Sequence, residues 1–314
     1  MTSTPTATPQ TTGNAPGRSP GIRPITLDAL GVPLSGLLAH PVDEPPRATI
    51  VALHGGGMRA GYFDGQADST LSVMTVAARL GFAVLALDRP GYGASAARLP
   101  AGGTLAEQAA RVSAALEAYA RTRLVGAGFL LLGHSYGGKL ALLIAAEGQP
   151  ATVLGVEVSG CGAEYAVPHD QLPDATRAGS LRHNWGSLRL YPEGSFTTLA
   201  PLVAARPERE CAGALDWPRA FPEVAARIRV PVRMTFAEYE YWWRHDDAAR
   251  ARMARAFPDS VVRFAGQPGA GHNISLGWTA RSYHLGVLGF FEECLAAHHT
   301  APAVSPARTV RTPA

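Results

Sequence analysis

The sequence is poor in cysteine, with only Cys161, Cys211 and Cys294 in a chain of 314 residues. They are unevenly spaced, and none belongs to a C-x-x-C pair or a Cys/His cluster. Disulfide frameworks and metal sites need such spacing. We therefore expect three free, partly buried thiols and no metal site.

The body of the chain also lacks an excess of charge of either sign. The formal net charge of +3 comes from Arg18, Arg308 and Arg311, which lie in terminal segments without acidic residues. The remaining 25 basic residues balance 25 acidic ones. Because a nucleic-acid interface needs a basic patch or stripe, we expect no nucleic-acid partner.

Residues 1–21 lack the charged segment and apolar core of a signal peptide, and they contain no run that could span a membrane. Both ends, residues 1–21 and 301–314, are rich in small residues and proline and have little that could pack. We expect them to be disordered. The sequence thus predicts one domain over residues 22–300, a cytoplasmic location and no membrane partner, with self-association left open.

Between the ends, apolar runs alternate with helical patterns, which is typical of a mostly parallel sheet with helices on both faces. A short Gly31-Val32-Pro33 turn indicates an antiparallel opening hairpin. Helices are expected over 69–80, 105–122 and 282–298, the second opened by a capping box of Thr104 and Glu107. Strands are expected at 24–30, 34–40, 49–53, 83–87, 129–132, 153–158, 232–236 and 261–264.

The alternation breaks over residues 162–228, which contain seven prolines. Long insertions in compact domains are usually lids or binding loops, so we interpret this segment as a cap; a passive helical decoration is the alternative. Trp185 and Trp217 in the segment, and Tyr241 and Trp242 after the seventh strand, are candidates for substrate contacts.

The pentapeptide Gly133–Gly137 follows an apolar strand and precedes a helical pattern, and it reads G-x-S-x-G. A serine on such a tight strand-to-helix turn is strained and exposed, and the glycines leave room for the backbone. We predict that Ser135 is a nucleophile.

A serine hydroxyl needs an imidazole to accept its proton, and the imidazole needs a carboxylate. His272 is the best placed histidine, because it lies in a glycine-rich loop between the last strand and the last helix. His284 falls inside that helix, and His134 should point away from the elbow. For the acid, Glu238 and Glu240 both follow the seventh strand, where α/β folds keep their active sites.

The transition state also needs two backbone N–H groups for the oxyanion. Tyr136, after the nucleophile, offers one. The glycines of His54–Met58 follow a strand, and Gly56 is the first choice for the second donor, before Gly57 and Met58. No phosphate-binding motif is formed by these glycines, so no cofactor is expected.

Taken together, the chain resembles the α/β-hydrolase fold superfamily over roughly residues 22–299. His54–Gly57 is similar to that family's oxyanion loop, Asp88–Ser95 to its D-x-x-G-x-G-x-S loop, and Gly133–Gly137 to its nucleophile elbow. The resemblance implies an eight-stranded sheet with an antiparallel second strand and a cap after the sixth. It also aligns Glu240 with the acid, in place of the commoner aspartate. Glu164, after the sixth strand, is a distant third position.

The sequence therefore predicts a serine hydrolase that cleaves an ester, thioester, amide or lactone of a small organic substrate through an acyl-enzyme on Ser135. An acyltransferase or cyclase with the same triad is one alternative. A ligand-binding protein without activity is another, although such a protein would need none of these residues.

Overall fold

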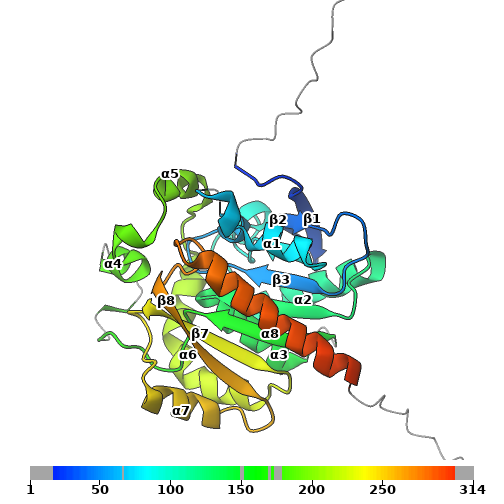
Figure 1. Cartoon of the computed structure of the whole chain (residues 1–314). Coiled ribbons are helices and arrows are strands. Elements are labelled where there is room, and N and C mark those ends of the chain that lie inside the picture. The colour runs from blue at the N-terminus through cyan, green and yellow to red at the C-terminus, as the bar shows by residue number, and fades with distance from the viewer. Residues whose placement is uncertain (1–16, 66, 149–151, 169–170, 173–178, 301–314) are drawn as a thin grey trace, which may run out of the picture.

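The protein is a single eight-stranded sheet covered by helices on both faces (Figure 1). The computed structural model describes residues 17–65, 67–148, 152–168, 171–172 and 179–300. The strand order is β1-β2-β4-β3-β5-β6-β7-β8; β2 is antiparallel to both neighbours, and the later pairs are parallel. The strands are β1 (Arg23–Ala29), β2 (Val32–Ala39), β3 (Thr49–Leu53), β4 (Ala83–Leu87), β5 (Phe129–His134), β6 (Val153–Ser159), β7 (Val232–Tyr239) and β8 (Val262–Gly271). The predicted fold class is confirmed.

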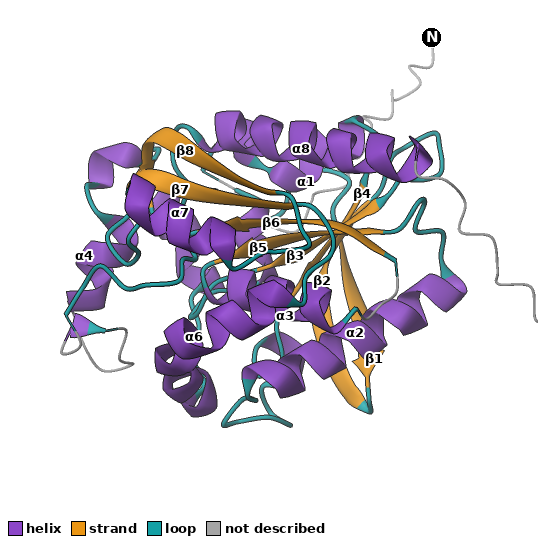
Figure 2. Cartoon of the chain, turned by 90° about the horizontal axis from the view of Figure 1, so that it is seen from below, coloured by secondary structure: helices purple, strands orange, loops and turns teal. Residues whose placement is uncertain are grey.

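The helices form two layers around this sheet. Figure 2 shows α1 and α8 over one face and α2, α3 and α6 over the other. Each layer closes its own apolar core against the sheet. The helices are α1 (Val73–Arg79), α2 (Leu105–Thr122), α3 (Tyr136–Glu147), α4 (Gly179–Trp185), α5 (Ser195–Leu199), α6 (Glu208–Ala226), α7 (Asp247–Arg255) and α8 (Ala280–Thr300).

Local sequence signals account for several of these boundaries. The capping box is present at α2, where Thr104 Oγ1 accepts from the Glu107 N–H and Glu107 accepts from the Thr104 N–H. The predicted helix over 69–80 is instead a 3-10 turn followed by α1, because the Ser72 side chain caps a new helix start. These differences move boundaries and leave the order of elements intact.

The opening hairpin turns one residue earlier than predicted. Leu30 and Gly31 both have positive φ, 58° and 78°, as a two-residue hairpin turn with the twist of its strands requires. Val32 and Pro33 therefore belong to β2, where they pair with Ala29 and Asp28.

The predicted N-terminal boundary at residue 22 is too late. Ser19 is buried, and its N–H and hydroxyl donate to the Asp64 carboxylate over 2.9 and 2.6 Å. These bonds satisfy a buried carboxylate, so the packed region includes residues before 22. Residues 1–16 and 301–314, the rest of the predicted tails, lie outside the described residues.

The segment predicted as a cap divides into two parts. Figure 1 shows α4 near the carboxyl end of β8 and α5 farther along the same side of the molecule, both outside the two helical layers. By contrast, α6 packs beside α3, and its Trp217 and Phe221 belong to the core. The prediction of a cap is therefore wrong for α6, which belongs to the same helical layer as α2 and α3 (Figure 2). A cap formed by the segment before α6 stays a prediction.

The three cysteines are free, with Cys161 and Cys294 buried and Cys211 partly buried. Across the described part of the chain, no helix combines the length and the apolar character needed to cross a membrane.

Candidate active site

Ser135 occupies the sharp turn between β5 and α3. Its backbone has φ 53° and ψ −116°, a conformation that a non-glycine residue adopts only when its surroundings impose it. A side chain at Gly133 would lie 2.5 Å from the Gly137 carbonyl oxygen, and one at Gly137 would lie 2.0 Å from the Leu53 carbonyl oxygen. The two glycines are therefore required by close packing, and the strained turn presents Ser135 to the cavity described below.

His272 connects Ser135 to Glu240. Its Nε2 lies 3.1 Å from Ser135 Oγ, and its Nδ1 lies 2.8 Å from Glu240 Oε2. His272 and Glu240 are both buried, which strengthens their interaction because the local dielectric is low. The other carboxylate oxygen, Oε1, accepts the Trp242 N–H over 2.9 Å. The structure thus brings three of the predicted residues into one hydrogen-bonded chain.

The alternative acids lie elsewhere. Glu238 is exposed and accepts the Gly269 N–H over 2.7 Å. The strand ends at Tyr239 and its alternation is broken before Glu240, because the pairing of β7 with β8 shifts between Ala237 and Tyr239 and the Glu240 N–H donates to the Ala237 carbonyl oxygen. Glu238 and Glu240 therefore face different ways. Glu164 forms surface ion pairs with Arg244 and Arg252.

Two other histidines that the sequence analysis weighed, His134 and His284, are buried. His134 stacks on Tyr62 with ring centroids 4.7 Å apart, and its Nδ1 lies 3.1 Å from Ser159 Oγ. Burial, reinforced by the nearby His272, lowers the pKa of His134 well below its usual value. His284 is buried in α8 without a hydrogen-bond partner in the described structure, and burial lowers its pKa to about 3.

A buried ion pair fixes the loop formed by His54–Met58. Arg89 donates to the carbonyl oxygens of His54 and Gly55 over 2.6 and 3.2 Å, and pairs with Glu210 of α6 at 2.8 Å. Tyr92 donates to the second Glu210 oxygen over 2.9 Å. Because breaking a buried pair leaves an uncompensated charge, this network holds the loop firmly against α6.

The predicted oxyanion donors surround Ser135. Gly56, Met58 and Tyr136 line the same cavity as the serine, and a side chain at Gly55 would lie 3.1 Å from Ser135 Cβ. The Gly57 N–H is already used, because it donates to Tyr92 Oη over 3.1 Å. Within the described ranges, the N–H groups of Gly56 and Tyr136 have no acceptor, and Tyr136 is the first residue of α3, where the helix dipole favours negative charge.

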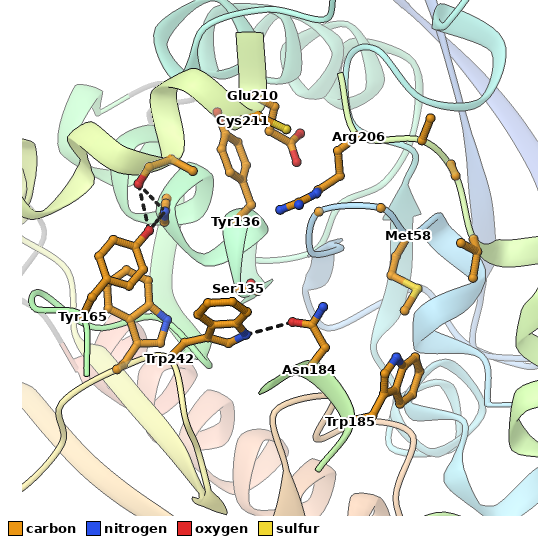
Figure 3. A pocket seen from close by; sticks show the side chains of 18 residues that line it. Met58, Ser135, Tyr136, Tyr165, Asn184, Trp185, Arg206, Glu210, Cys211 and Trp242 are labelled. Carbon is orange, nitrogen blue, oxygen red and sulfur yellow. Dashed lines mark hydrogen bonds between the residues drawn. The ribbon is translucent and has the colours of Figure 1, made fainter. Parts of the chain in front are cut away.

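A cavity of about 420 Å³ opens over Ser135 (Figure 3). Trp185 and Trp242, two of the candidates for substrate contacts, line it, and Trp242 Nε1 donates to Asn184 Oδ1 over 2.8 Å. The two other predicted contact residues do not reach it. Trp217 is buried and donates to the Gly162 carbonyl oxygen, whereas Tyr241 is exposed.

The only lysine of the chain, Lys139, lies in the wall of this cavity. It is one turn after Ser135 in α3, and its Nζ donates to Tyr165 Oη and the Ala214 carbonyl oxygen, each over 3.2 Å. Four aromatic rings surround the amine at 5.3 to 6.0 Å. Burial, together with the positive charges of Arg89 and Arg206, lowers the pKa of Lys139 to about 8.

We expect Lys139→Met to stabilise the protein at pH 7 by up to about 3 kcal/mol, because the buried ammonium is disfavoured relative to the unfolded chain. Below pH 8 lysine is charged in both states, so the cost is complete. As the pH rises from about 8 to the ordinary value of 10.5 the folded protein loses the proton first and the cost declines. Urea unfolding of both proteins at pH 7 and pH 10 measures this; an equal difference at the two pH values would contradict it.

From the sequence alone, no role was assigned to Arg89, Glu210 or Lys139. Lys139 had a visible signal, since a lone charge interrupts an apolar helical run next to the nucleophile. The pairing of Arg89 with Glu210 joins residues 121 positions apart, and no local pattern indicates it. In the part of the chain that the structure describes, no cluster of three or more His, Cys, Asp or Glu side chains could hold a metal ion.

Comparison with known proteins gives the same architecture. The chain is similar to a thermostable carboxyl esterase from Bacillus coagulans, with 14% identity, a TM-score of 0.66, and coverage of 88% of this chain and 100% of that one. It is also similar to a lipase-esterase related protein from Clostridium acetobutylicum, with 16% identity, a TM-score of 0.60, and coverage of 86% of this chain and 99% of that one. A thioesterase domain from the curacin biosynthetic pathway is similar with 17% identity, a TM-score of 0.58, and coverage of 85% of this chain and 99% of that domain. At these identities the likeness concerns the fold alone.

No curated protein matches the chain. The model of the alpha/beta hydrolase family, however, matches residues 50–281, from the start of the central strands to the beginning of the last helix. This match covers most of the sequence and includes every element that positions Ser135, His272 and Glu240. The chain therefore belongs to the alpha/beta hydrolase family.

Proposed function

We propose that the protein is a serine hydrolase that cleaves an ester, thioester, amide or lactone bond of a small organic substrate through an acyl-enzyme. The observation that supports this most strongly is the hydrogen-bonded chain from Ser135 through His272 to Glu240, which ends at a cavity. A protein that only binds a ligand would need neither the strained serine nor the buried carboxylate behind the histidine.

In the first half of the reaction, Ser135 Oγ attacks the substrate carbonyl carbon while His272 Nε2 accepts the hydroxyl proton. Glu240 accepts a hydrogen bond from Nδ1–H, which fixes the tautomer and stabilises the imidazolium. The oxyanion then accepts hydrogen bonds from the N–H groups of Gly56 and Tyr136. Collapse of this intermediate expels the leaving group, which takes the proton from His272.

In the second half, water attacks the acyl-enzyme and gives its proton to His272. The second tetrahedral intermediate releases the carboxylic acid and returns the proton to Ser135 Oγ. Each step uses the same two oxyanion donors. The Arg89–Glu210 pair holds the His54–Met58 loop that carries Gly56, and Tyr136 is fixed as the first residue of α3. Energy is then not spent on reorganising the site during the reaction.

Labelling with a fluorophosphonate tests this function directly. We expect one covalent adduct on the peptide that contains Ser135, seen by intact mass and peptide mapping. Labelling should be slowed at least a hundredfold in His272→Ala, because the serine loses the base that activates it. The matched control is His284→Leu, which removes a buried histidine without partners in the described structure and should label at the wild-type rate. An adduct elsewhere, or rapid labelling of folded His272→Ala, would refute the proposal.

A further inference from the structure

The charges around the cavity are unequal. Lys139, Arg206 and Glu210 are the charged residues of its lining. Glu210 is already satisfied, since Arg89 and Tyr92 each bind one of its carboxylate oxygens. The cavity therefore contains two cations and no unpaired carboxylate.

Arg206 lines the cavity, unlike the nearby Arg209. Within the described structure its guanidinium has no ion-pair or hydrogen-bond partner, although it lines the cavity. Figure 3 shows it pointing into the cavity between Tyr136 and Met58, above Ser135. Arg209, three residues later, is exposed and pairs with Glu107 on the surface at 2.8 Å. An arginine whose only role is to keep the surface polar would be expected to be exposed, as Arg209 is.

The backbone around Arg206 is fixed on both sides, which places its side chain. The Ala204 N–H donates to the Gly57 carbonyl oxygen over 2.9 Å. Pro207 is buried and packs so closely on Gly91 and Gly102 that a side chain at Gly102 would lie 2.4 Å from it. Arg206 Cδ lies 2.9 Å from the point where a Gly56 side chain would begin. The cation is thus built onto the oxyanion loop, one residue from the glycine that contacts Ser135.

From this arrangement we infer that the substrate carries a carboxylate, which Arg206 binds while Ser135 attacks the ester or thioester carbonyl. This inference rests on the proposed hydrolase function and adds its substrate class. A guanidinium presents two parallel N–H groups that match the two oxygens of a carboxylate. Lys139 uses two of its three N–H donors within the protein, and its charge makes the inner wall of the cavity favourable for the same anion.

Two esters of equal shape test the inference. Mono-p-nitrophenyl adipate ends in a carboxylate, and p-nitrophenyl 6-methylheptanoate replaces that group by an isopropyl group. We expect the wild type to prefer the adipate ester at least tenfold in kcat/KM, after subtraction of spontaneous hydrolysis. Arg206→Gln should lower the ratio of the two kcat/KM values at least tenfold, and Lys139→Met should lower it as well. Arg206→Lys should restore part of the ratio, and Arg209→Gln should keep the wild-type ratio.

The ratio of the two kcat/KM values tests the anion site, whereas Ser135-dependent cleavage of either ester tests the hydrolase function. If neither ester is cleaved in a Ser135-dependent way, the hydrolase proposal fails, and calorimetric binding of hexanoate and hexanamide still tests the anion site. Arg206→Gln should weaken hexanoate binding at least tenfold and leave hexanamide binding as in the wild type. A wild type without preference, an unchanged ratio in Arg206→Gln, or no hexanoate binding at millimolar concentration would overturn the inference. Equal losses for both esters would instead assign Arg206 to the oxyanion.

Discussion

Replacing Ser135 by alanine is expected to lower kcat by about 10⁴-fold or more, leaving only the slow rate that the oxyanion donors and substrate binding support without a nucleophile. The hydroxyl is hydrogen-bonded to the buried His272, with Oγ 3.1 Å from Nε2. Its loss removes the acyl-enzyme route altogether, while the cavity and its cations stay in place. KM should therefore change little, because the substrate still binds the same walls.

The measurement is steady-state hydrolysis of a p-nitrophenyl ester, with thermal unfolding to show that the variant is folded. The strained backbone at position 135 should persist in the variant, because the neighbouring Gly133 and Gly137 still pack against the same backbone atoms. The matched control is Ser195→Ala, because Ser195 is buried in α5 and its hydroxyl has no partner among the described residues. That variant should keep the wild-type kcat. A Ser135→Ala enzyme within tenfold of the wild type would show that another residue is the nucleophile.

The sequence allowed the fold to be predicted because its signals are local. Apolar runs fall within all eight strands, and the capping box of Thr104 and Glu107 begins α2 as expected. The elbow was visible for the same reason. A Cβ atom at Gly133 or Gly137 would lie within 2.5 Å of a backbone oxygen, so the tight turn requires the two glycines of the pentapeptide. Residues that depend on one tight turn can be found without knowledge of the rest of the fold.

Long-range packing explains what the sequence could not predict. Trp217 was expected in a cap because it lies in the segment where the alternation breaks. Yet α6 continues through Pro218 and Pro222 and buries Trp217 near Lys139 of α3 and Phe221 against Phe257. Tertiary burial outweighs local propensity there. The role of Arg89 likewise depends on Glu210. That residue lies in α6, beyond the segment that follows β6, and only the folded chain places it beside Arg89.

The choice between Glu238 and Glu240 depends partly on local sequence and partly on how β7 pairs with β8. An extended chain would have placed Glu238 and Glu240 on one face, since side chains two apart in a strand point the same way. The irregular pairing after Ala237 and the turn from the Glu240 N–H to the Ala237 carbonyl oxygen break that alternation. Such a bulge is a known means of redirecting a side chain beside an active site, and its position could not be read from the sequence.

Glu240→Gln is therefore expected to lower kcat by about 10² to 10⁴-fold with the fold intact. The amide keeps the size of the side chain and can still accept the Trp242 N–H through its oxygen. It then presents its NH₂ group to His272 Nδ1, so the imidazole is held in the wrong tautomer and the imidazolium loses its counter-charge.

Glu238→Gln is the matched control, two residues away in the same segment. Its side chain is exposed, accepts the Gly269 N–H and is hydrogen-bonded to the Tyr239 side chain. An amide can keep both contacts, and neither involves His272, so the kcat of this variant should fall less than tenfold. The two kcat values, measured with one ester at a pH where the wild type is fully active, decide the assignment. A near-normal Glu240→Gln enzyme, or a larger loss in Glu238→Gln, would show that the carboxylate hydrogen-bonded to His272 is not the one that the reaction uses.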